Sequence, residues 1–297
     1  MTDIPLMTRR AISCAVFLSV CTLTLHGQTL PAGGSADSLD LHLMTFNIRY
    51  GTADDGDNRW ELRKALVFAL IHEELPDILG VQEALLFQLD EIREAVPGYE
   101  MVGVGRDDGR TQGEYSAILY RSDRFHRVEE ETFWFSDTPT IPGSTSWGNA
   151  ITRICTWVRL VDIRSQRGLY VYNLHLDHIS QPSREKSLAL LVERIRKRTD
   201  TEPFVVMGDF NAGEENPAVR FLKSEEVGLT DTYRHYHPAD SSVGTYHAFS
   251  GDRTGEKIDH IFVEPRTVVL DAAILHRVTD GRFPSDHFPV TARIRIK

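Results

Sequence analysis

The sequence predicts an α+β fold in which two mostly antiparallel sheets pack against each other and carry helices on their outer faces. Three observations lead to this prediction. Many short apolar runs have the length of strands, few segments have the apolar stripe of a helix, and a helix does not follow every strand. A doubly wound parallel sheet, in which a helix follows each strand, is therefore disfavoured.

The strands and helices are predicted from periodicity and from residues that begin or end each element. Runs rich in β-branched, aromatic and aliphatic residues predict strands at 41–48, 77–82, 115–121, 154–163, 168–176, 203–209, 257–263 and 288–296. Apolar stripes predict helices at 61–74, 84–95 and 183–198. Ser183 suits the start of the third helix, and Pro97 with Gly98 stops the second.

The composition is that of a soluble globular protein. The chain has 297 residues, of which 41% are hydrophobic and 26% are charged. A domain of this class can be this long, so we expect one domain over residues 41–297, preceded by a flexible run-in at 28–40. We also expect a monomer.

The N-terminus has the pattern of a secretory signal peptide at residues 1–27. Arg9 and Arg10 precede fifteen uncharged residues, and small residues follow, with cleavage expected near Gly27 or as late as Ala36. A membrane span needs about 20 apolar residues. A lipid on Cys21 is disfavoured because bulky Val20 precedes it. We therefore expect a secreted or periplasmic protein without a stable membrane span.

The net charge and the cysteine content restrict the expected ligands and the expected disulfide bonding. The net charge is −10, and removing residues 1–27 takes away two arginines and one aspartate, which gives −11. Proteins that grip a long nucleic acid usually have a basic face, and no block of Lys and Arg occurs here. Cys155 is the cysteine outside the leader, so no internal disulfide is expected, and its strand-like surroundings predict a buried thiol.

Polar residues recur at the ends of the predicted strands, where a rigid scaffold commonly presents functional groups. They are Asn47; Gln82 and Glu83; Asn173, His175, Asp177 and His178; Asp209 and Asn211; Asp259; and Asp286 and His287. Carboxylates, amides and histidines without thiolates suit a hard divalent cation such as Mg²⁺ or Mn²⁺.

Each of these motifs also has an ordinary structural interpretation. Asp and Asn after a strand are good turn residues, so "GDFNA" alone is as consistent with a turn as with a site. "SDH" between two prolines fits a surface turn, and the acid of "QE" fits the start of a helix. The acid in "IDH" lies inside an apolar strand, where a buried carboxylate must be paired or functional.

A zinc pair in "HLDH" is disfavoured by the geometry of a strand. Residues three apart point to opposite faces, so His175 and His178 share one ion only if the strand breaks between them. His175 and Asp177 share a face.

Taken together, six motifs resemble the endonuclease/exonuclease/phosphatase superfamily. In chain order they are "TFNIRY", "GVQE", "NLHLDH", "GDFN", "IDHIF" and "SDHFPV", and the resemblance covers residues 42–297. It implies a four-layer α/β/β/α sandwich and Mg²⁺-dependent hydrolysis of phosphate esters. Each motif alone is weak, whereas their order is specific. The segments "NIRYGTADDGDNRWELRK" and "GVGRDDGRTQGEYSAILY" further resemble a mostly bacterial and often secreted branch of the superfamily.

The resemblance also implies a role for each motif. Asn47, Glu83 and Asp286 match metal-site positions, with Glu83 as the principal ligand. His175 matches a histidine that contacts the scissile phosphate, and Asp209 and Asn211 match the pair that positions the attacking water and the phosphate. Asp259 matches the acid that orients His287. An Asp–His pair holds one imidazole tautomer and stabilises an imidazolium.

The residues expected to recognise the substrate lie mainly between the second and third motifs. Arginine suits bidentate phosphate binding, and aromatic rings stack on a base or a sugar, although these aromatics equally suit the bracing of a long loop. Our candidates are Arg49, Arg106, Tyr115, Trp134, Trp147, Arg153 and His178.

Two classes of function remain at this point. The first is a metal-dependent phosphoric ester hydrolase acting on a nucleotide or nucleic acid, a phospholipid head group or a phosphorylated glycan. The acidic chain favours a small or glycan-linked ester over long duplex DNA. The second is a binding protein that keeps the fold without catalysis, and the presence of Asp209, Asn211, Asp259 and His287 together argues against it.

Overall fold

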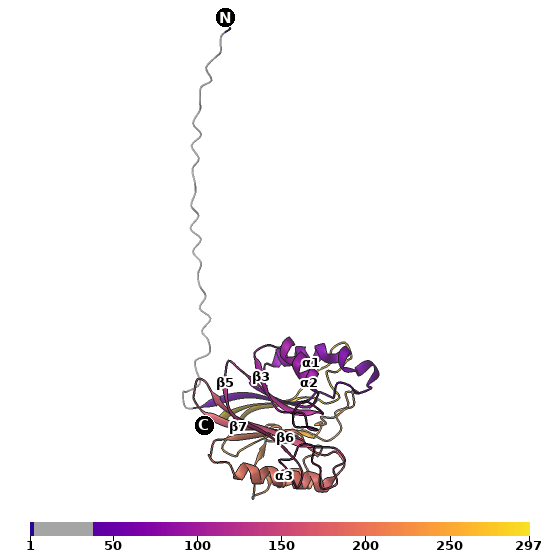
Figure 1. The fold of residues 1–297 in the computed structure, drawn as a ribbon, viewed down its shortest axis with the longest axis vertical. Helices are drawn as coiled ribbons and strands as arrows, with labels where there is room; N and C mark the ends of the chain where they lie inside the picture. Colours follow the sequence, from indigo (N-terminus) through magenta and orange to yellow (C-terminus); the bar gives the residue numbers. More distant parts are fainter. Residues whose placement is uncertain (3–37) are drawn as a thin grey trace. The chain divides into compact units, whose positions relative to one another are not determined.

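The computed structural model describes residues 1–2 and 38–297, so the leader and most of the run-in lie outside the described residues. From residue 38 onward the chain forms two six-stranded sheets with helices on their outer sides (Figure 1). Two of the ten strand pairings are parallel and the rest are antiparallel. The predicted fold class and its four-layer order are confirmed.

The first sheet has the order β11-β12-β1-β2-β4-β3. Its strands are β1 (Leu39–Asn47), β2 (Ile78–Ala84), β3 (Tyr99–Val102), β4 (Tyr115–Arg121), β11 (Val268–Ile274) and β12 (Val290–Ile296). Strand β1 pairs in parallel with β2, which places the ends of these two strands, Asn47 and Gln82, side by side.

The second sheet has the order β5-β6-β7-β8-β10-β9. Its strands are β5 (Phe125–Trp134), β6 (Ile154–Asp162), β7 (Gly168–His175), β8 (Phe204–Asp209), β9 (Thr230–Asp231) and β10 (Asp259–Val263). Here β7 runs parallel to β8 with His175 opposite Asp209, and β10 runs antiparallel to β8 with Asp259 opposite Asp209. The register therefore gathers three predicted site residues at one end of the sheet.

The helices are α1 (Trp60–Glu74), α2 (Leu86–Ala95), α3 (Gln181–Arg196), α4 (Pro217–Lys223) and α5 (Thr232–Tyr236), with a 3-10 turn at Gly56–Asn58. Helices α1 to α4 cover the outer faces of the sheets, whereas the short α5 packs between the sheets, where its Tyr233 joins the inter-sheet core. Figure 1 shows α1 and α2 on one side of the two sheets and α3 on the other. The three predicted helices are present within two residues of their expected bounds, and the short α4 and α5 were not predicted.

Alternation along the central strands creates three separate hydrophobic cores. In β1, Leu41 and Leu43 face the second sheet, whereas Met44 and Phe46 pack with α1 and α2. Strands β7 and β8 likewise divide their residues between the inter-sheet core and the core under α3 and α4. Because both faces are buried, these strands have nearly continuous apolar sequences.

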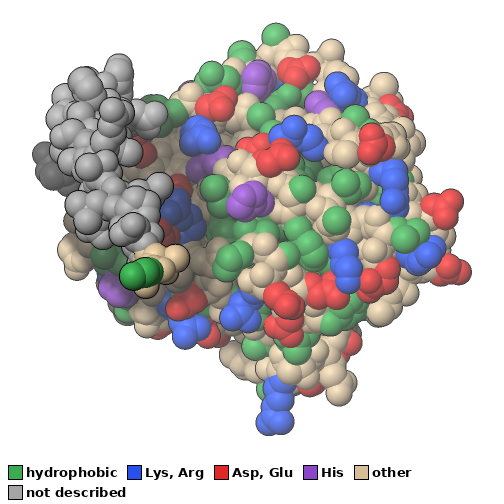
Figure 2. Space-filling model, turned by 90° about the horizontal axis from the view of Figure 1, so that it is seen from above, with side chains coloured by type: hydrophobic (Ala, Val, Ile, Leu, Met, Phe, Trp, Pro, Cys, Tyr) green, Lys and Arg blue, Asp and Glu red, His purple; other side chains and the backbone are tan. Residues whose placement is uncertain are grey.

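Two sequence expectations concern single features of this fold. Cys155 on β6 is buried, as predicted, and is a free thiol in the described part of the chain; burial raises the pKa of this thiol. No helix within residues 38–297 has the length and apolar character that crossing a membrane requires. Figure 2 shows acidic and basic side chains interspersed on the face it displays, without a continuous basic block.

Candidate active site

The ends of strands from both sheets meet around one cavity of about 430 Å³. The loop after β1 and strand β2 line it from the first sheet, and the ends of β7 and β8 line it from the second. The loops that precede β4, β6, β10 and β12 complete the lining. The ten predicted site residues in its lining are Arg49, Glu83, Arg106, Arg153, His175, His178, Asp209, Asn211, Asp286 and His287. Residues from all six motifs thus line one cavity, since "IDHIF" supplies Ile258, and its Asp259 acts through a bond to His287.

The backbone at this cavity is held in an uncommon conformation at three predicted site residues. Arg49, Glu83 and Asn211 have φ values of 57°, 58° and 47°, in the left-handed region that side chains other than glycine seldom adopt. At Glu83 this accompanies a register shift between β2 and β4, so the strand continues to Ala84 through a bulge. Such strain persists where the surrounding structure fixes it, and it concentrates at functional sites.

Asn47 joins the two sheets at the bottom of this site. It is fully buried, and its amide Nδ2 donates to Glu83 Oε1 and to Asp209 Oδ2, both at 3.0 Å. Its Oδ1 accepts from the backbone N–H of Arg49 at 3.0 Å. Asn47 therefore lies between the carboxylates of Glu83 and Asp209 and donates a hydrogen bond to each. Its role as a metal ligand stays a prediction.

Asp209 is a buried carboxylate at the end of β8 in the "GDFN" motif. Its Oδ1 accepts from the backbone N–H of Asn211 at 2.9 Å, so the turn interpretation of this motif holds alongside the site interpretation. Burial, and then the neighbouring Asp259 carboxylate, raise the pKa of Asp209 to about 7. A carboxylate with such a pKa can take up and release a proton near neutral pH.

Asp259 and His287 form a buried pair beside Asp209. His287 Nδ1 donates to Asp259 Oδ2 at 2.9 Å, and its Nε2 lies 3.8 Å from Asp209 Oδ2. Burial alone would lower the pKa of His287, but the Asp259 and Asp209 carboxylates reverse this and raise it well above its usual value. When protonated, His287 directs its Nε2–H toward Asp209 and the cavity.

The acid of "IDH" thus has the buried partner that its place in an apolar strand requires.

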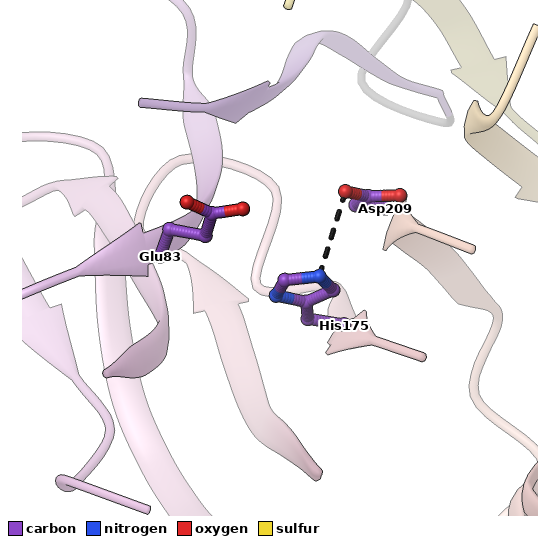
Figure 3. Close-up of side chains that lie close together, drawn as sticks. All are labelled: Glu83, His175 and Asp209. Atoms are coloured by element: carbon purple, nitrogen blue, oxygen red, sulfur yellow. Dashed lines mark ion pairs between the residues drawn. The ribbon is translucent and has the colours of Figure 1, made fainter. Parts of the chain in front are cut away.

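The donor set fits a hard divalent cation. Oxygens of Glu83 and Asp209 and a nitrogen of His175 come within 4.8 Å of one another, and Figure 3 shows these three side chains converging from the two sheets. Asp286 lines the same cavity, and burial followed by the Glu83 charge raises its pKa. Carboxylates that raise one another's pKa gather negative charge that a bound cation would offset.

Arg49 and Arg106 enter the cavity already paired with carboxylates. Arg49 forms a bidentate pair with Asp55 at 2.8 and 3.1 Å and lies within 4 Å of Glu83 and Asp286. Arg106 donates to Glu114 at 2.7 Å.

Glu114 was not predicted. It begins the segment leading into β4, lines the cavity, and lies 4.0 Å from His175 Nδ1, and burial raises its pKa. An acid immediately before an apolar strand is the one signal for it in the sequence.

Arg63 is a second residue that the sequence did not reveal. It lies on α1 with 1% exposure, and its guanidinium donates to four backbone carbonyls, those of Ile48, Arg49, Asn58 and Pro284, at 2.7–2.9 Å. These carbonyls belong to the loop that follows Asn47 and the loop that precedes Asp286. Arg63 therefore ties together two segments that carry site residues.

The predicted aromatic residues lie outside the cavity lining. Tyr115 donates its hydroxyl to Arg110 O, and Trp134 Nε1 donates to Arg106 O, so both brace the loop between β3 and β4. Trp147 donates to Asp137 within the neighbouring loop. These hydrogen bonds agree with the alternative left open by the sequence, in which the three aromatic residues brace long loops. Contact between these residues and a substrate stays a prediction.

The two histidines of "HLDH" come together after all, because β7 ends at His175 and the chain turns. Their meeting point is the Arg153 guanidinium, which bonds to both. His178 belongs to neither of the potential metal-binding clusters found among the described residues.

Two packed sheets that gather acids, amides and an Asp–His pair at one end define a phosphoesterase fold. The chain belongs to the Endonuclease/Exonuclease/phosphatase family, whose pattern it matches over residues 44–287. The family resemblance seen in the six motifs is confirmed.

Solved structures agree with this assignment. An endonuclease/exonuclease/phosphatase family protein from Bacteroides thetaiotaomicron is 34% identical with a TM-score of 0.83, covering 88% of this chain and 96% of that one. A mannosyl-6-phosphatase from the same species is 35% identical with a TM-score of 0.79, covering 86% and 99%. The human Nocturnin catalytic domain, at 20% identity and a TM-score of 0.68, covers 87% and 96% and shows the same fold.

An uncharacterised protein of Acanthamoeba polyphaga mimivirus is 31% identical over 165 residues. That match covers 53% of this chain and spans 61% of the viral protein's length.

Proposed function

We propose that this protein is an exported, divalent-cation-dependent phosphoesterase that cleaves its substrate by attack of water on phosphorus. The observation that carries the proposal is the meeting of Glu83, Asp209 and the Asp259–His287 pair in one cavity. A protein that only binds ligands has no need of a carboxylate with a pKa near 7 beside a buried Asp–His pair that raises the pKa of the histidine.

Each of these side chains has a role in hydrolysis that follows from its protonation state. Asp209, as the carboxylate, accepts a proton from the attacking water, and Asn211 on the following turn offers its amide to the phosphate. His287 donates from Nε2 to a phosphate or leaving oxygen, while Asp259 holds its tautomer and stabilises its charge. Glu83, with Asp286 and Asn47, would hold Mg²⁺ or Mn²⁺, which supplies positive charge to the non-bridging oxygens.

A phosphomonoester on a sugar is the substrate class that we test first. The mannosyl-6-phosphatase is 35% identical and is matched over 99% of its length, which supports this class. Nucleotides, nucleic acids and phospholipid head groups are the other classes. The net charge of −10 disfavours long duplex DNA among them.

The test is phosphate release from mannose 6-phosphate, a nucleoside monophosphate, sphingomyelin, p-nitrophenyl phosphate and bis-p-nitrophenyl phosphate, with Mg²⁺, Mn²⁺ or EDTA. We expect metal-dependent hydrolysis that falls about 100-fold or more in His287→Ala. The matched control is His126→Ala, which removes an exposed histidine from β5. Hydrolysis of none of these esters, or activity unchanged by EDTA or by His287→Ala, would contradict the proposal.

Export is a separate part of the proposal. It is supported by the leader pattern at residues 1–27, which lies outside the described residues. Mass spectrometry of the protein from its native host should find an N-terminus between residues 28 and 37, in a monomer by size-exclusion chromatography. An intact Met1 terminus would count against export.

A further inference from the structure

Arg153 holds an unusual position among the arginines of the cavity. It directly precedes β6 and is 4% exposed. Its Nη1 donates to His175 Nε2 and its Nη2 donates to His178 Nδ1, each at 2.9 Å. Arg49 and Arg106, by comparison, direct their guanidinium groups at the carboxylates of Asp55 and Glu114.

These two bonds fix the tautomers of both imidazoles. A guanidinium has only donors, so His175 Nε2 and His178 Nδ1 must each accept through a lone pair. His175 therefore carries its proton on Nδ1, which lies 4.0 Å from Glu114 Oε2. With its Nε2 lone pair committed to Arg153, His175 neither donates from that atom to a phosphate nor binds a cation there. Of the cluster formed with Glu83 and Asp209, the two carboxylates are therefore the groups left to hold a cation.

Arg153 keeps donors that nothing in the described residues uses. Two of its five N–H groups bond to the histidines, and its buried Nε has no hydrogen-bond partner. The carboxylate nearest to Nε is Asp177 Oδ2 at 3.7 Å, and the other oxygen of Asp177 caps the turn at Ile179 and Ser180. Asp177 therefore offsets the charge of Arg153 as an ion-pair partner, but the unused donors still lack acceptors, and a buried donor without an acceptor is costly.

The place of this charge matches the proposed chemistry. His175 Nε2, which accepts from Arg153, lies 3.6 Å from Asp209 Oδ2, and a dashed line joins these two side chains in Figure 3. An anion bound to the guanidinium would therefore lie next to the carboxylate that accepts the proton of water.

We propose that Arg153 binds a non-bridging oxygen of the substrate's phosphate, and that His175 and His178 are positioning residues that hold the guanidinium in place. The proposal rests on the phosphoesterase function. It replaces the direct contact between His175 and phosphate that the family resemblance implied with a contact made by Arg153. Guanidinium groups suit this task because they donate to phosphate oxygens with a fixed geometry.

The first experiment measures the binding of inorganic phosphate to the Mg²⁺-loaded protein by calorimetry. Arg153→Gln should raise the dissociation constant about 10- to 100-fold, as expected for loss of a hydrogen bond to a charged group. The matched control is Arg184→Gln, because Arg184 is also buried and donates to Asp177 O on the same turn but does not line the cavity. This control should bind phosphate like the wild type.

Equal binding by wild type and Arg153→Gln would overturn the proposal, and so would a wild type that binds no phosphate. A protein that binds phosphate through Arg153 but hydrolyses no ester would instead contradict the phosphoesterase function alone. Thermal unfolding of both variants identifies a loss of binding that comes from misfolding.

The second experiment does not use an Arg153 variant, so its result does not depend on whether such a variant folds. Two-bond ¹H–¹⁵N correlation spectra distinguish the Nδ1–H and Nε2–H tautomers of histidine, and the His175→Gln spectrum identifies the signals of His175. We expect His175 as the neutral Nδ1–H tautomer and His178 as the Nε2–H tautomer. A proton on His175 Nε2 would overturn the proposal.

Discussion

Replacing Asp209 by asparagine should stabilise the metal-free protein while it abolishes hydrolysis. Asp209 is 1% exposed, and burial together with the Asp259 carboxylate raises its pKa to about 7. At alkaline pH the folded protein must therefore hold an unfavourable negative charge that the unfolded chain exposes to water. Asparagine has nearly the same shape and removes this charge.

The magnitude follows from the two pKa values. The pKa of Asp209 is about 3.9 in the unfolded chain and about 7 in the folded protein. At 1.36 kcal/mol per pKa unit, this difference corresponds to about 4 kcal/mol. Both oxygens of Asp209 accept hydrogen bonds, so the amide group of an asparagine would point its N–H at another donor, either Asn47 Nδ2 or the backbone N–H of Asn211. This unfavourable contact costs about 1–2 kcal/mol. We therefore expect a net gain of about 2–3 kcal/mol at pH 8.

The sign of the pH dependence is fixed by the direction of the shift. Because the folded pKa is raised, wild-type stability falls as the pH rises from about 4 to about 7, and the unfavourable charge is fully present above that window. The advantage of Asp209→Asn should therefore be largest at pH 8. At pH 4.5 it should have vanished, since folded wild-type Asp209 is then protonated.

The assay is urea unfolding of both proteins in EDTA at pH 8 and pH 4.5, followed by circular dichroism. A variant no more stable than wild type at pH 8 would refute the reasoning, and so would a difference that stays constant with pH. Mg²⁺ at pH 8 should stabilise the wild type more than the variant, because a cation offsets the charge that asparagine lacks.

Two further predictions concern residues that shape the site. Gly208→Ala should cost about 3 kcal/mol in urea unfolding, because a Cβ there would collide with the backbone of Leu174 on the parallel strand. The control Gly56→Ala, where a Cβ meets nothing within 4 Å, should cost about 1 kcal/mol, and equal costs would contradict the close approach. Arg63→Met should lower kcat about tenfold with little change in KM, as a displaced catalytic loop would. The control Arg59→Met loses one exposed hydrogen bond, to Gly56 O, and should keep the kcat of the wild type. An unchanged kcat in Arg63→Met would refute the role of Arg63.

Much of the fold could be predicted because the central strands are buried on both faces. Their runs are apolar throughout, and turn residues bound each of them, so β1, β2, β4, β6, β7, β8, β10 and β12 stand out. The edge strand β5 carries three consecutive glutamates from Glu129, so it lacks an apolar run. In β11, another edge strand, Asp271 divides the apolar sequence into two runs of three residues, each too short to stand out. The helices α4 and α5, of seven and five residues, are too short for a periodic pattern.

The site was predictable where function placed polar groups at the ends of apolar strands. Asp209, Asp259 and His287 follow this pattern, and the strand register brings them together. Arg63 does not follow it, because it lies on a helix that begins with charged residues and its partner Pro284 is 221 residues away. Burial that arises from such distant contacts leaves no local pattern in the sequence.

The tautomer of His175 shows a second kind of limit. Residue spacing indicated only that His175 and His178 would separate if the strand continued. The turn after His175 and the entry of Arg153 from the loop before β6 decide the outcome. Hydrogen-bond partners from three segments are a property of the folded chain, so the donor or acceptor role of such a residue has to come from the structure.

The most direct test of the central claim is hydrolysis of the best phosphate ester from the substrate screen in ¹⁸O-labelled water with Mg²⁺. If water attacks phosphorus beside Asp209 and His287, each phosphate released should carry one ¹⁸O atom, and EDTA should stop its release. Label found in the alcohol instead of the phosphate, or label incorporated equally by His287→Ala, would contradict the account.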